Sequence, residues 1–197
     1  MKPRSGNLTA IAFDFWGIIA DMNPPMNEYL QVRNVPLEQY KSQIHELIVQ
    51  HDLNLLSEKQ FLEACGNLVG IKIPYPECRF TYQEKNMNLP LIEIIKKLKP
   101  KYKIAILSNN YREYSEEYIF TPGLDSLFDA IVLSYQVGHR KPSPEIYQSL
   151  INQLGVDSKK ILFLDDEPEK LPEATKQGMK ILLYKRGEAE EILTNLI

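Results

Sequence analysis

The chain has 197 residues, of which 44% are hydrophobic and 25% are charged, and its formal net charge is -3 at pH 7. This length fits one domain of ordinary size with a small insert, and the composition excludes a wholly disordered chain. The 23 Lys and Arg residues nearly balance the 26 Asp and Glu residues. Such a balance disfavours a nucleic-acid-binding surface and a polybasic membrane-binding surface.

The cysteine count and the apolar runs bear on the cellular compartment. Cys65 and Cys78 are the only cysteines, too few for a disulfide framework or a four-cysteine zinc site. No apolar run approaches the roughly 18 residues of a membrane-spanning helix. Residues 8–20 faintly resemble a signal peptide, but Asp14 places a charge inside the stretch, so we predict that it belongs to the mature protein. The expectation is a reduced, cytoplasmic protein.

Short runs rich in Ile and Leu are the first structural signal along the chain. They scarcely alternate with polar residues, which is typical of strands buried on both faces of a parallel sheet. Helical patterns separate the later runs, at residues 88–99, from Ser143-Pro144 to Gly155, and at 167–177. This alternation predicts an α/β fold with a doubly wound, mainly parallel, Rossmann-like sheet. The predicted strands are residues 8–15, 104–107, 130–133, 161–164 and 181–184.

A helical segment interrupts this rhythm after the first strand. Residues 36–50 have an apolar helical face, and Ser57 to Gln60 form a capping box that opens a second helix. No convincing strand pattern occurs in this part of the sequence. We therefore predict a small helical cap domain at residues 22–87, inserted into an α/β core domain formed by residues 1–21 and 88–197.

Polar residues gather where the predicted strands end. Asp14, Ser108 and the pair Asp165-Asp166 each follow a strand, and Lys141 lies in the loop after the third strand. In open α/β sheets, ligands bind beyond the carboxyl ends of the strands. A hard cation such as Mg²⁺ relieves the repulsion between clustered carboxylates, and a lysine and a hydroxyl suit phosphoryl oxygens. These residues predict Mg²⁺-assisted phosphoryl transfer.

The same residues, in the same order, resemble the four motifs of the haloacid dehalogenase-like hydrolase superfamily. The sequence GHRKPSPEIY at residues 138–147, and its distance from residues 164–166, resemble the phosphatase branch with a small helical cap after strand 1. The resemblance implies a Mg²⁺-dependent phosphohydrolase for a small phosphomonoester, with sugar phosphates among the candidates. It implies no nucleic-acid or membrane partner and leaves the oligomeric state open.

The resemblance also implies a role for each motif residue. Asp14 would be the nucleophile that forms an aspartyl-phosphate, and Lys141 would neutralise both this carboxylate and the phosphate. The helical insert would close over the site and set the substrate choice. The metal ligands would be Asp14, the backbone carbonyl of Trp16, Asp165 and Asp166, and the phosphate would be bound by Ser108, the amide of Asn109 and Lys141.

Trp16 departs from the family pattern. Phosphatases of this kind usually place a second Asp two residues after the nucleophile, where it protonates the leaving oxygen. Such acid–base help is typically worth about 10²–10⁴ in rate, so we expect slow turnover and place Trp16 in the substrate pocket. Two alternatives stay open. One is a catalytically weak or inactive binding or regulatory protein, and the other is a metal-independent 2-haloacid dehalogenase, a branch that does not keep the acidic pair Asp165-Asp166.

Residues outside the motifs receive plainer predictions. We expect His45, His51 and Arg140 to be exposed surface or loop residues. Cys65 is predicted to be a small buried apolar residue of a helix.

Overall fold

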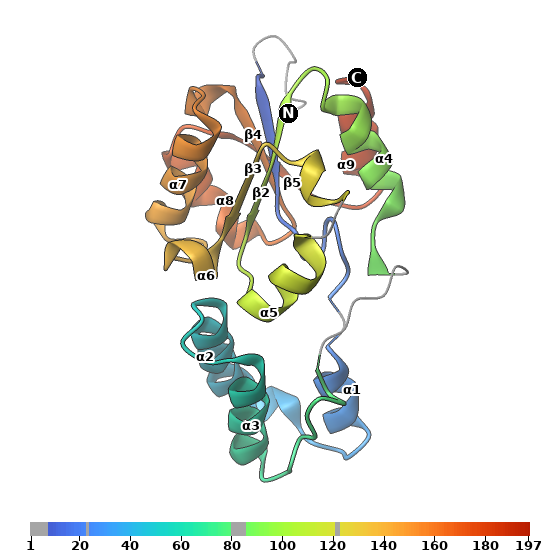
Figure 1. The fold of residues 1–197 in the computed structure, drawn as a ribbon, viewed down its shortest axis with the longest axis vertical. Helices are drawn as coiled ribbons and strands as arrows, with labels where there is room; N and C mark the ends of the chain where they lie inside the picture. The colour runs from blue at the N-terminus through green and yellow to red at the C-terminus, as the bar shows by residue number, and fades with distance from the viewer. Residues whose placement is uncertain (1–7, 23, 80–85, 121–122) are drawn as a thin grey trace.

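The computed structural model describes residues 8–22, 24–79, 86–120 and 123–197. Within these ranges it contains one five-stranded parallel sheet with the order β3-β2-β1-β4-β5 (Figure 1). This confirms the predicted doubly wound α/β fold. The strands are β1 (Ala10–Phe13), β2 (Lys103–Ser108), β3 (Ala130–Leu133), β4 (Ile161–Asp165) and β5 (Lys180–Leu183).

The register of the central strands aligns the ends that carry polar residues. Phe13 of β1 lies opposite Ile106 of β2 and opposite Leu164 of β4. Asp14 directly follows Phe13, and Asp165 directly follows Leu164. The sheet therefore brings these two carboxylates to the same level at one edge.

Helices cover both faces of the sheet because alternate strand side chains point to opposite sides. Ile11, Phe13 and Ile104 belong to the hydrophobic cluster under α4 and α9, and Ala12 and Phe163 belong to the cluster under α7 and α8. The result is a three-layer α/β/α core (Figure 1). The helices are α4 (Leu89–Leu98), α7 (Pro144–Leu154), α8 (Leu171–Lys176, after the 3₁₀ turn η7, Pro168–Lys170) and α9 (Glu188–Thr194).

The predicted limits of α7 match the structure. Ser143 is its N-cap residue, and Pro144 occupies the first helical position. Gly155 ends the helix in the left-handed conformation, with φ 61°. A residue with a side chain adopts this conformation only at a cost, which explains the glycine at this position.

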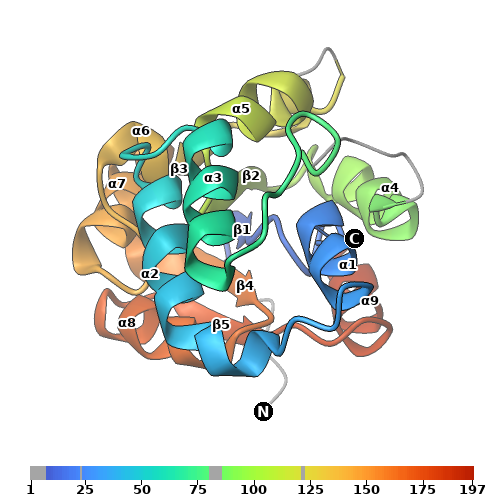
Figure 2. The same ribbon diagram turned by 90° about the horizontal axis from the view of Figure 1, so that it is seen from below.

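A second group of helices lies beyond the carboxyl ends of the strands (Figures 1 and 2). It has its own apolar cluster, which includes Met26, Leu30, Leu62 and Cys65. The group occupies the segment predicted to be a cap, whose exact limits stay a prediction. Its members are α1 (Pro25–Gln31), the 3₁₀ turn η2 (Leu37–Tyr40), α2 (Lys41–Asp52) and α3 (Glu58–Val69), and we call them the cap helices.

The capping box that predicted the start of α3 is present. The Ser57 Oγ accepts a hydrogen bond from the Gln60 amide at 3.3 Å, and the Gln60 Oε1 accepts one from the Ser57 amide at 2.9 Å. Two backbone donors that would otherwise lack helical partners are satisfied in this way. The local sequence thus determines where this helix begins.

The remaining elements are short, and the one that follows β2 contacts the cap helices. After β2, α5 and η4 lie beside α3 (Figure 2), and the Glu58 amide donates to the Glu113 Oε1 at 3.0 Å. Within the described ranges, no helix has both the length and the apolar character that a membrane crossing requires. The short elements are α5 (Arg112–Tyr114), η4 (Ser115–Ile119), η5 (Asp125–Leu127), α6 (Ser134–Val137) and η6 (Ser158–Lys160).

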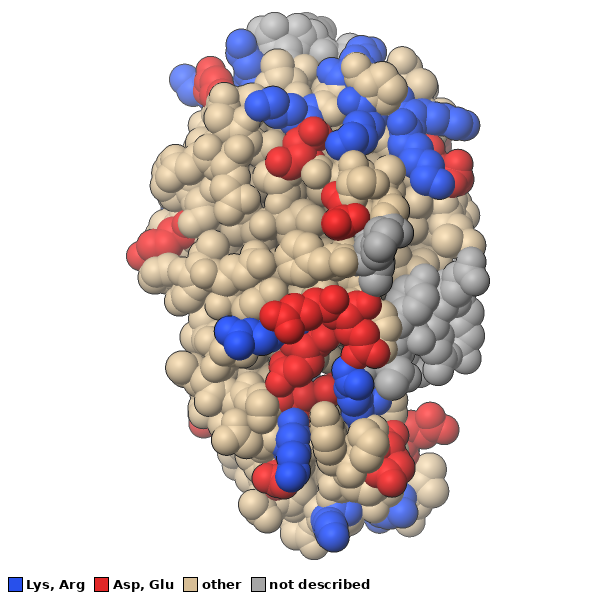
Figure 3. All heavy atoms as spheres, viewed as in Figure 1, with Lys and Arg blue, Asp and Glu red and all other residues tan. Residues whose placement is uncertain are grey.

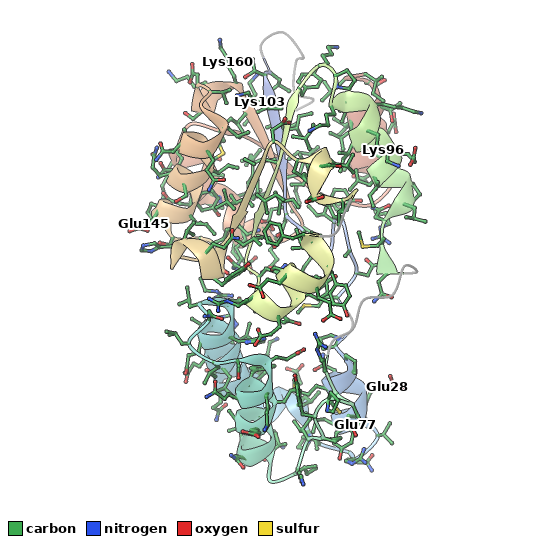
Figure 4. The ribbon with its side chains drawn as sticks, in the orientation of Figure 1. Glu28, Glu77, Lys96, Lys103, Glu145 and Lys160 are labelled. Carbon is green, nitrogen blue, oxygen red and sulfur yellow. The ribbon has the colours of Figure 1, made fainter. Side chains whose placement is uncertain are left out.

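Charged side chains are distributed unevenly between the two ends of the core. Lys and Arg gather at the end far from the cap helices (Figure 3), where Figure 4 places Lys103 and Lys160. Acidic side chains gather over α5 and η4, which carry Glu113, Glu116 and Glu117 (Figure 3). The surface near the junction of core and cap is therefore acidic.

Candidate active site

A buried lysine lies between two carboxylates at the edge of the sheet. The Lys141 Nζ is 3.0 Å from the Asp14 Oδ1 and 2.6 Å from the Asp165 Oδ2. Lys141 is 1% exposed, Asp14 is 5% exposed and Asp165 is fully buried. Charged side chains are almost never buried to this degree unless they are paired. The predicted convergence of these three residues is present.

Backbone hydrogen bonds hold both carboxylates in place. The Asp14 amide continues the β1–β4 ladder by donating to the Leu164 carbonyl at 2.9 Å, and the Asp14 Oδ1 accepts from the Phe15 amide at 2.7 Å. The Asp165 Oδ1 accepts from the Glu167 amide at 2.9 Å. Each side chain is thus oriented by the first residues of the loop that follows its own strand.

The loop that carries Lys141 is fixed by Asn109. The Asn109 Nδ2 donates to the Lys141 carbonyl at 3.1 Å, and the Lys141 amide donates to the Asn109 Oδ1 at 2.7 Å. Sequence reasoning considered only the backbone amide of Asn109 and missed this function of its side chain. Ser108, the last residue of β2, is fully buried at the same end of the sheet. Binding of phosphate by Ser108 and Asn109 stays a prediction.

Three carboxylates form a candidate metal centre. Asp14, Asp165 and Asp166 each offer an oxygen, and the three oxygens lie within 4.8 Å of one another. The backbone leaves room for Asp166, because a Cβ on Gly17 would lie 2.2 Å from the Asp166 Oδ2. Gly17 also has φ 75°, which disfavours a larger residue. A donor set made only of oxygens suits Mg²⁺ and similar hard cations.

Burial and neighbouring charges shift the pKa values of Asp165, Asp166 and Lys141. Burial and the neighbouring Asp14 raise the pKa of Asp165 above its ordinary range, and the same two causes raise the pKa of Asp166. Burial alone would lower the pKa of Lys141, but the charges of Asp14 and Asp165 outweigh it and raise that pKa. Lys141 therefore stays an ammonium ion, and the excess of negative charge is concentrated on the carboxylates.

Comparisons with known proteins assign the chain to a family. The sequence profile of the haloacid dehalogenase-like hydrolases matches residues 11–184. The chain belongs to this family. It is 26% identical over 171 residues to a D-ribitol-5-phosphate phosphatase of Bacteroides thetaiotaomicron, covering 79% of this chain and 82% of that protein. It is 25% identical over 181 residues to a phosphorylated carbohydrates phosphatase of Thermotoga maritima, covering 88% and 83%.

The fold of the family is also evident in solved structures. A crystal structure of a haloacid dehalogenase family enzyme from Bacteroides thetaiotaomicron superposes with a TM-score of 0.71 at 18% identity. The match covers 92% of this chain and 95% of that one. The same enzyme has been solved in complex with magnesium and inorganic phosphate.

Trp16 occupies the position where phosphatases of the family usually carry the second Asp. It is half-buried, and its ring packs against Phe15 at 5.2 Å and against Tyr114 at 4.5 Å between centroids. Trp16 is not among the residues that line the cavity among the cap helices, so its place in the substrate pocket stays a prediction. Its aromatic packing accounts for a large side chain at this position.

A cavity of about 470 Å³ lies among the cap helices and reaches the core at Tyr111. Tyr111 follows the Ser108–Asn110 loop directly. Asp52, the last residue of α2, also lines the cavity, and its Oδ2 accepts hydrogen bonds from Arg140 at 2.8 and 3.2 Å. Arg140 directly precedes Lys141, and burial together with the charge of Asp14 raises the pKa of Asp52, so the Asp52 wall of the cavity lies near the candidate active site.

Two predictions about surface residues are wrong. Arg140 is only partly exposed, because Asp52 of the cap helices pairs with it. His51 is 4% exposed, and its ring stacks on Phe61 at 4.9 Å and contacts Tyr111 at 4.0 Å between centroids. Burial lowers the pKa of His51, so the ring is neutral at neutral pH. The predictions for His45, which is exposed, and for Cys65, which is fully buried, are confirmed.

Sequence reasoning also missed Asp52. Its carboxylate is buried, and burial raises its pKa to about 6, although Arg140 opposes the shift. The Ser134 hydroxyl donates to the Asp52 carbonyl at 2.7 Å, which adds a second link between α2 and the core. A polar His-Asp pair at the end of an otherwise apolar helix face was the available signal.

Proposed function

We propose that this protein is a Mg²⁺-dependent phosphohydrolase that acts on a small phosphomonoester through an aspartyl-phosphate intermediate. The observation that carries this proposal is the contact of one buried ammonium with Asp14 and Asp165, beside the third carboxylate of Asp166. Relatives named as phosphatases support the reaction class. Phosphorylated sugars and polyols are the first compounds to assay, because those relatives are named for them.

Asp14 is the residue best placed to attack phosphorus. One of its carboxylate oxygens would form a bond to phosphorus while the ester oxygen leaves with its bonding electrons and takes up a proton. Water would then attack the aspartyl-phosphate and release inorganic phosphate and the free carboxylate. Lys141 contacts the Asp14 Oδ1, so its ammonium can neutralise charge on both the carboxylate and the phosphoryl group.

The donor set at the strand ends fits a magnesium ion. Asp14, Asp165 and Asp166 would hold it, together with the backbone carbonyl of Trp16. When bound, the ion supplies a positive charge that offsets the charge of the phosphoryl oxygens. Ser108 and the amide of Asn109 would donate hydrogen bonds to those oxygens. The Asn109 side chain keeps Lys141 in position through its two bonds to the Lys141 backbone.

Turnover is expected to be slow for substrates with poor leaving groups. Trp16 cannot give a proton to the leaving oxygen, and acid–base help of this kind is typically worth about 10²–10⁴ in rate. Acyl and anomeric phosphates need less help because their leaving groups are better. Trp16 is also the observation that favours the second candidate function, a phosphate-binding protein with weak or no catalysis.

The test is a hydrolysis assay of purified protein on a phosphate panel that includes acetyl phosphate, with and without Mg²⁺. Mg²⁺-dependent phosphate release is the expected result. Binding of a phosphate mimic with Mg²⁺ but without turnover would favour the second candidate. Halide release from 2-haloacids without metal would favour the dehalogenase alternative.

The substitution Trp16→Asp tests how the metal is held. We expect Mg²⁺ binding to persist, within about threefold in Kd, because the proposed ligand at this position is the backbone carbonyl and not the side chain. Isothermal titration with Mg²⁺ measures this directly. Phe15→Leu is the control for the lost aromatic packing. Loss of Mg²⁺ binding in Trp16→Asp but not in this control would contradict the assignment of the backbone carbonyl as the ligand.

The affinity for Mg²⁺ should fall as the pH falls. The pKa values of Asp165 and Asp166 are raised, so protons occupy these carboxylates at a higher pH than ordinary aspartates and must leave before the metal binds. The loss should reach up to about tenfold per pH unit for each proton displaced. Titrations with Mg²⁺ at pH 8, 7 and 6 measure it, and a flat profile would show that the carboxylates are ionised throughout.

A further inference from the structure

The cavity among the cap helices has an apolar interior. Its inner wall includes Met26, Ile44, Ile48, Phe61 and Leu62, which are buried or half-buried. A volume of about 470 Å³ lies within the range of pockets that hold small organic ligands. The interior can therefore enclose an organic group that extends from the candidate active site.

Three buried polar residues that line this cavity already have partners. The His51 Nδ1 bonds with the Leu56 carbonyl at 2.9 Å, and both faces of the ring are in contact with aromatic rings. The Glu58 carboxylate pairs with Arg79 at 2.9 Å, and Asp52 pairs with Arg140. A ligand hydroxyl that reached these atoms would have to compete with their existing bonds.

Four further polar side chains of the lining lie in exposed positions. Asn27, Glu38, Lys41 and His45 are all exposed to solvent. The cavity thus has a polar rim and an apolar interior. Burying a hydroxyl without a hydrogen-bond partner is unfavourable, whereas each buried methylene is favourable by roughly 0.8 kcal/mol.

The charges around the cavity also limit the ligand. Asp52 and Glu58 line it, and acidic side chains gather over the neighbouring α5 and η4 (Figure 3). Both carboxylates are already paired with arginines, and Lys41 lies at the exposed rim, so a second phosphate or a carboxylate would find no buried cation to pair with among the described lining residues. The lining therefore favours an organic group that carries no further negative charge.

From these features we infer that the phosphomonoester substrate carries an apolar organic group, such as an alkyl or aryl chain, and not a polyol. The organic group occupies the cavity among the cap helices while the phosphate lies against Lys141. This inference rests on the proposed function, and its substrate class differs from the sugar and polyol phosphates that the names of the relatives suggest.

A chain-length series of n-alkyl phosphates tests the inference. With wild-type protein, kcat/KM should rise roughly threefold to fourfold per added methylene, the factor that corresponds to the burial of one methylene, until the cavity is filled. n-Pentyl phosphate and D-ribitol 5-phosphate are a matched pair with the same carbon chain, and pentyl phosphate should be preferred by about tenfold or more. A flat series, or preference for the ribitol ester, would overturn the inference.

A variant pair links the effect to the cavity. Ile48→Asn places an amide on the inner wall and should lower kcat/KM for hexyl phosphate about tenfold. Leu55→Asn is the control, because Leu55 is 68% exposed and does not line the cavity. Equal losses in both variants would count against the assignment. If Ile48→Asn fails to fold, binding of n-alkyl phosphonates to wild-type protein, with Kd falling as the chain lengthens, replaces it.

The outcomes separate this inference from the proposed function. Hydrolysis of acetyl phosphate that is lost in Asp14→Asn supports the proposed function whatever the chain-length series shows. Chain-length-dependent binding of phosphonates without any turnover supports the cavity assignment and removes the catalytic proposal. Phosphonate binding whose Kd does not change with chain length would overturn the cavity assignment, with or without turnover.

Discussion

Replacing Asp14 by Asn is expected to lower kcat by at least about 10³-fold, because the amide cannot attack phosphorus and loss of a nucleophile is among the most severe catalytic changes. The amide keeps the size of the carboxylate, so the fold should survive. The measurement is initial-rate hydrolysis of acetyl phosphate in saturating Mg²⁺.

The control for this substitution is Asp157→Asn. Asp157 is exposed and lies in the loop before β4, at the opposite end of the strand from Asp165. The kcat of the Asp157→Asn variant should match that of the wild type. Undiminished activity in Asp14→Asn would mean that the nucleophile is a different residue or that the hydrolysis comes from a contaminant.

Replacing Lys141 by Met is expected to destabilise the protein by about 3–5 kcal/mol at pH 8 without metal. The substitution leaves the buried carboxylates of Asp14 and Asp165 without their shared ammonium, and breaking a buried ion pair has costs of this size. Chemical denaturation of both proteins in EDTA measures the difference. Mg²⁺ should restore much of the stability, because a cation again lies among the carboxylates.

The pH dependence of this deficit has a definite sign. Without the ammonium, the raised pKa of Asp165 rises further, and a proton neutralises this carboxylate as the pH falls. The deficit relative to wild type should therefore shrink between pH 8 and pH 5.5. Lys170→Met is the matched control. Lys170 is also buried, but among the described residues its ion pair is with the exposed Glu167 at 3.5 Å, so this substitution should lower the stability by less than about 1 kcal/mol. If Lys141→Met lost no more stability than Lys170→Met, the result would contradict the buried cluster of Asp14, Lys141 and Asp165.

Local sequence patterns determine much of this structure. Apolar runs that do not alternate predict strands buried on both faces, and five such runs became β1 to β5. Capping signals at Ser57 and Ser143 predict the starts of α3 and α7. The carboxyl ends of parallel strands meet at one edge, so the positions of Asp14, Lys141 and Asp165 in the sequence were enough to predict their convergence.

The end of the first strand and the contacts between distant segments were not predicted. The first predicted strand extended to Phe15, whereas β1 ends at Phe13 because the Phe15 carbonyl accepts hydrogen bonds from the amides of Ile19 and Ala20 in a tight turn. The pair of Asp52 and Arg140 joins residues 88 positions apart. Nothing in the neighbourhood of either residue specifies the other.

The cavity illustrates the same limit of local patterns. Ile44 and Ile48 lie one turn apart on α2, and this spacing predicts an apolar face but not what that face contacts. Ile44 and Ile48 line a cavity together with residues of the apolar cluster such as Met26 and Leu62. Only the arrangement of α1, η2, α2 and α3 distinguishes a packed face from a binding surface.

The central claim is that Asp14, Lys141 and Asp165 meet around one cation and one tetrahedral anion. A crystal structure determined with Mg²⁺ and beryllium fluoride, a mimic of a phosphoryl group bonded to a carboxylate, tests it most directly. We predict the mimic on the Asp14 side chain, in contact with Ser108 and Lys141, and Mg²⁺ bound by Asp14 and Asp165. Mg²⁺ and the mimic bound elsewhere, with Lys141 still paired to both carboxylates, would contradict the claim.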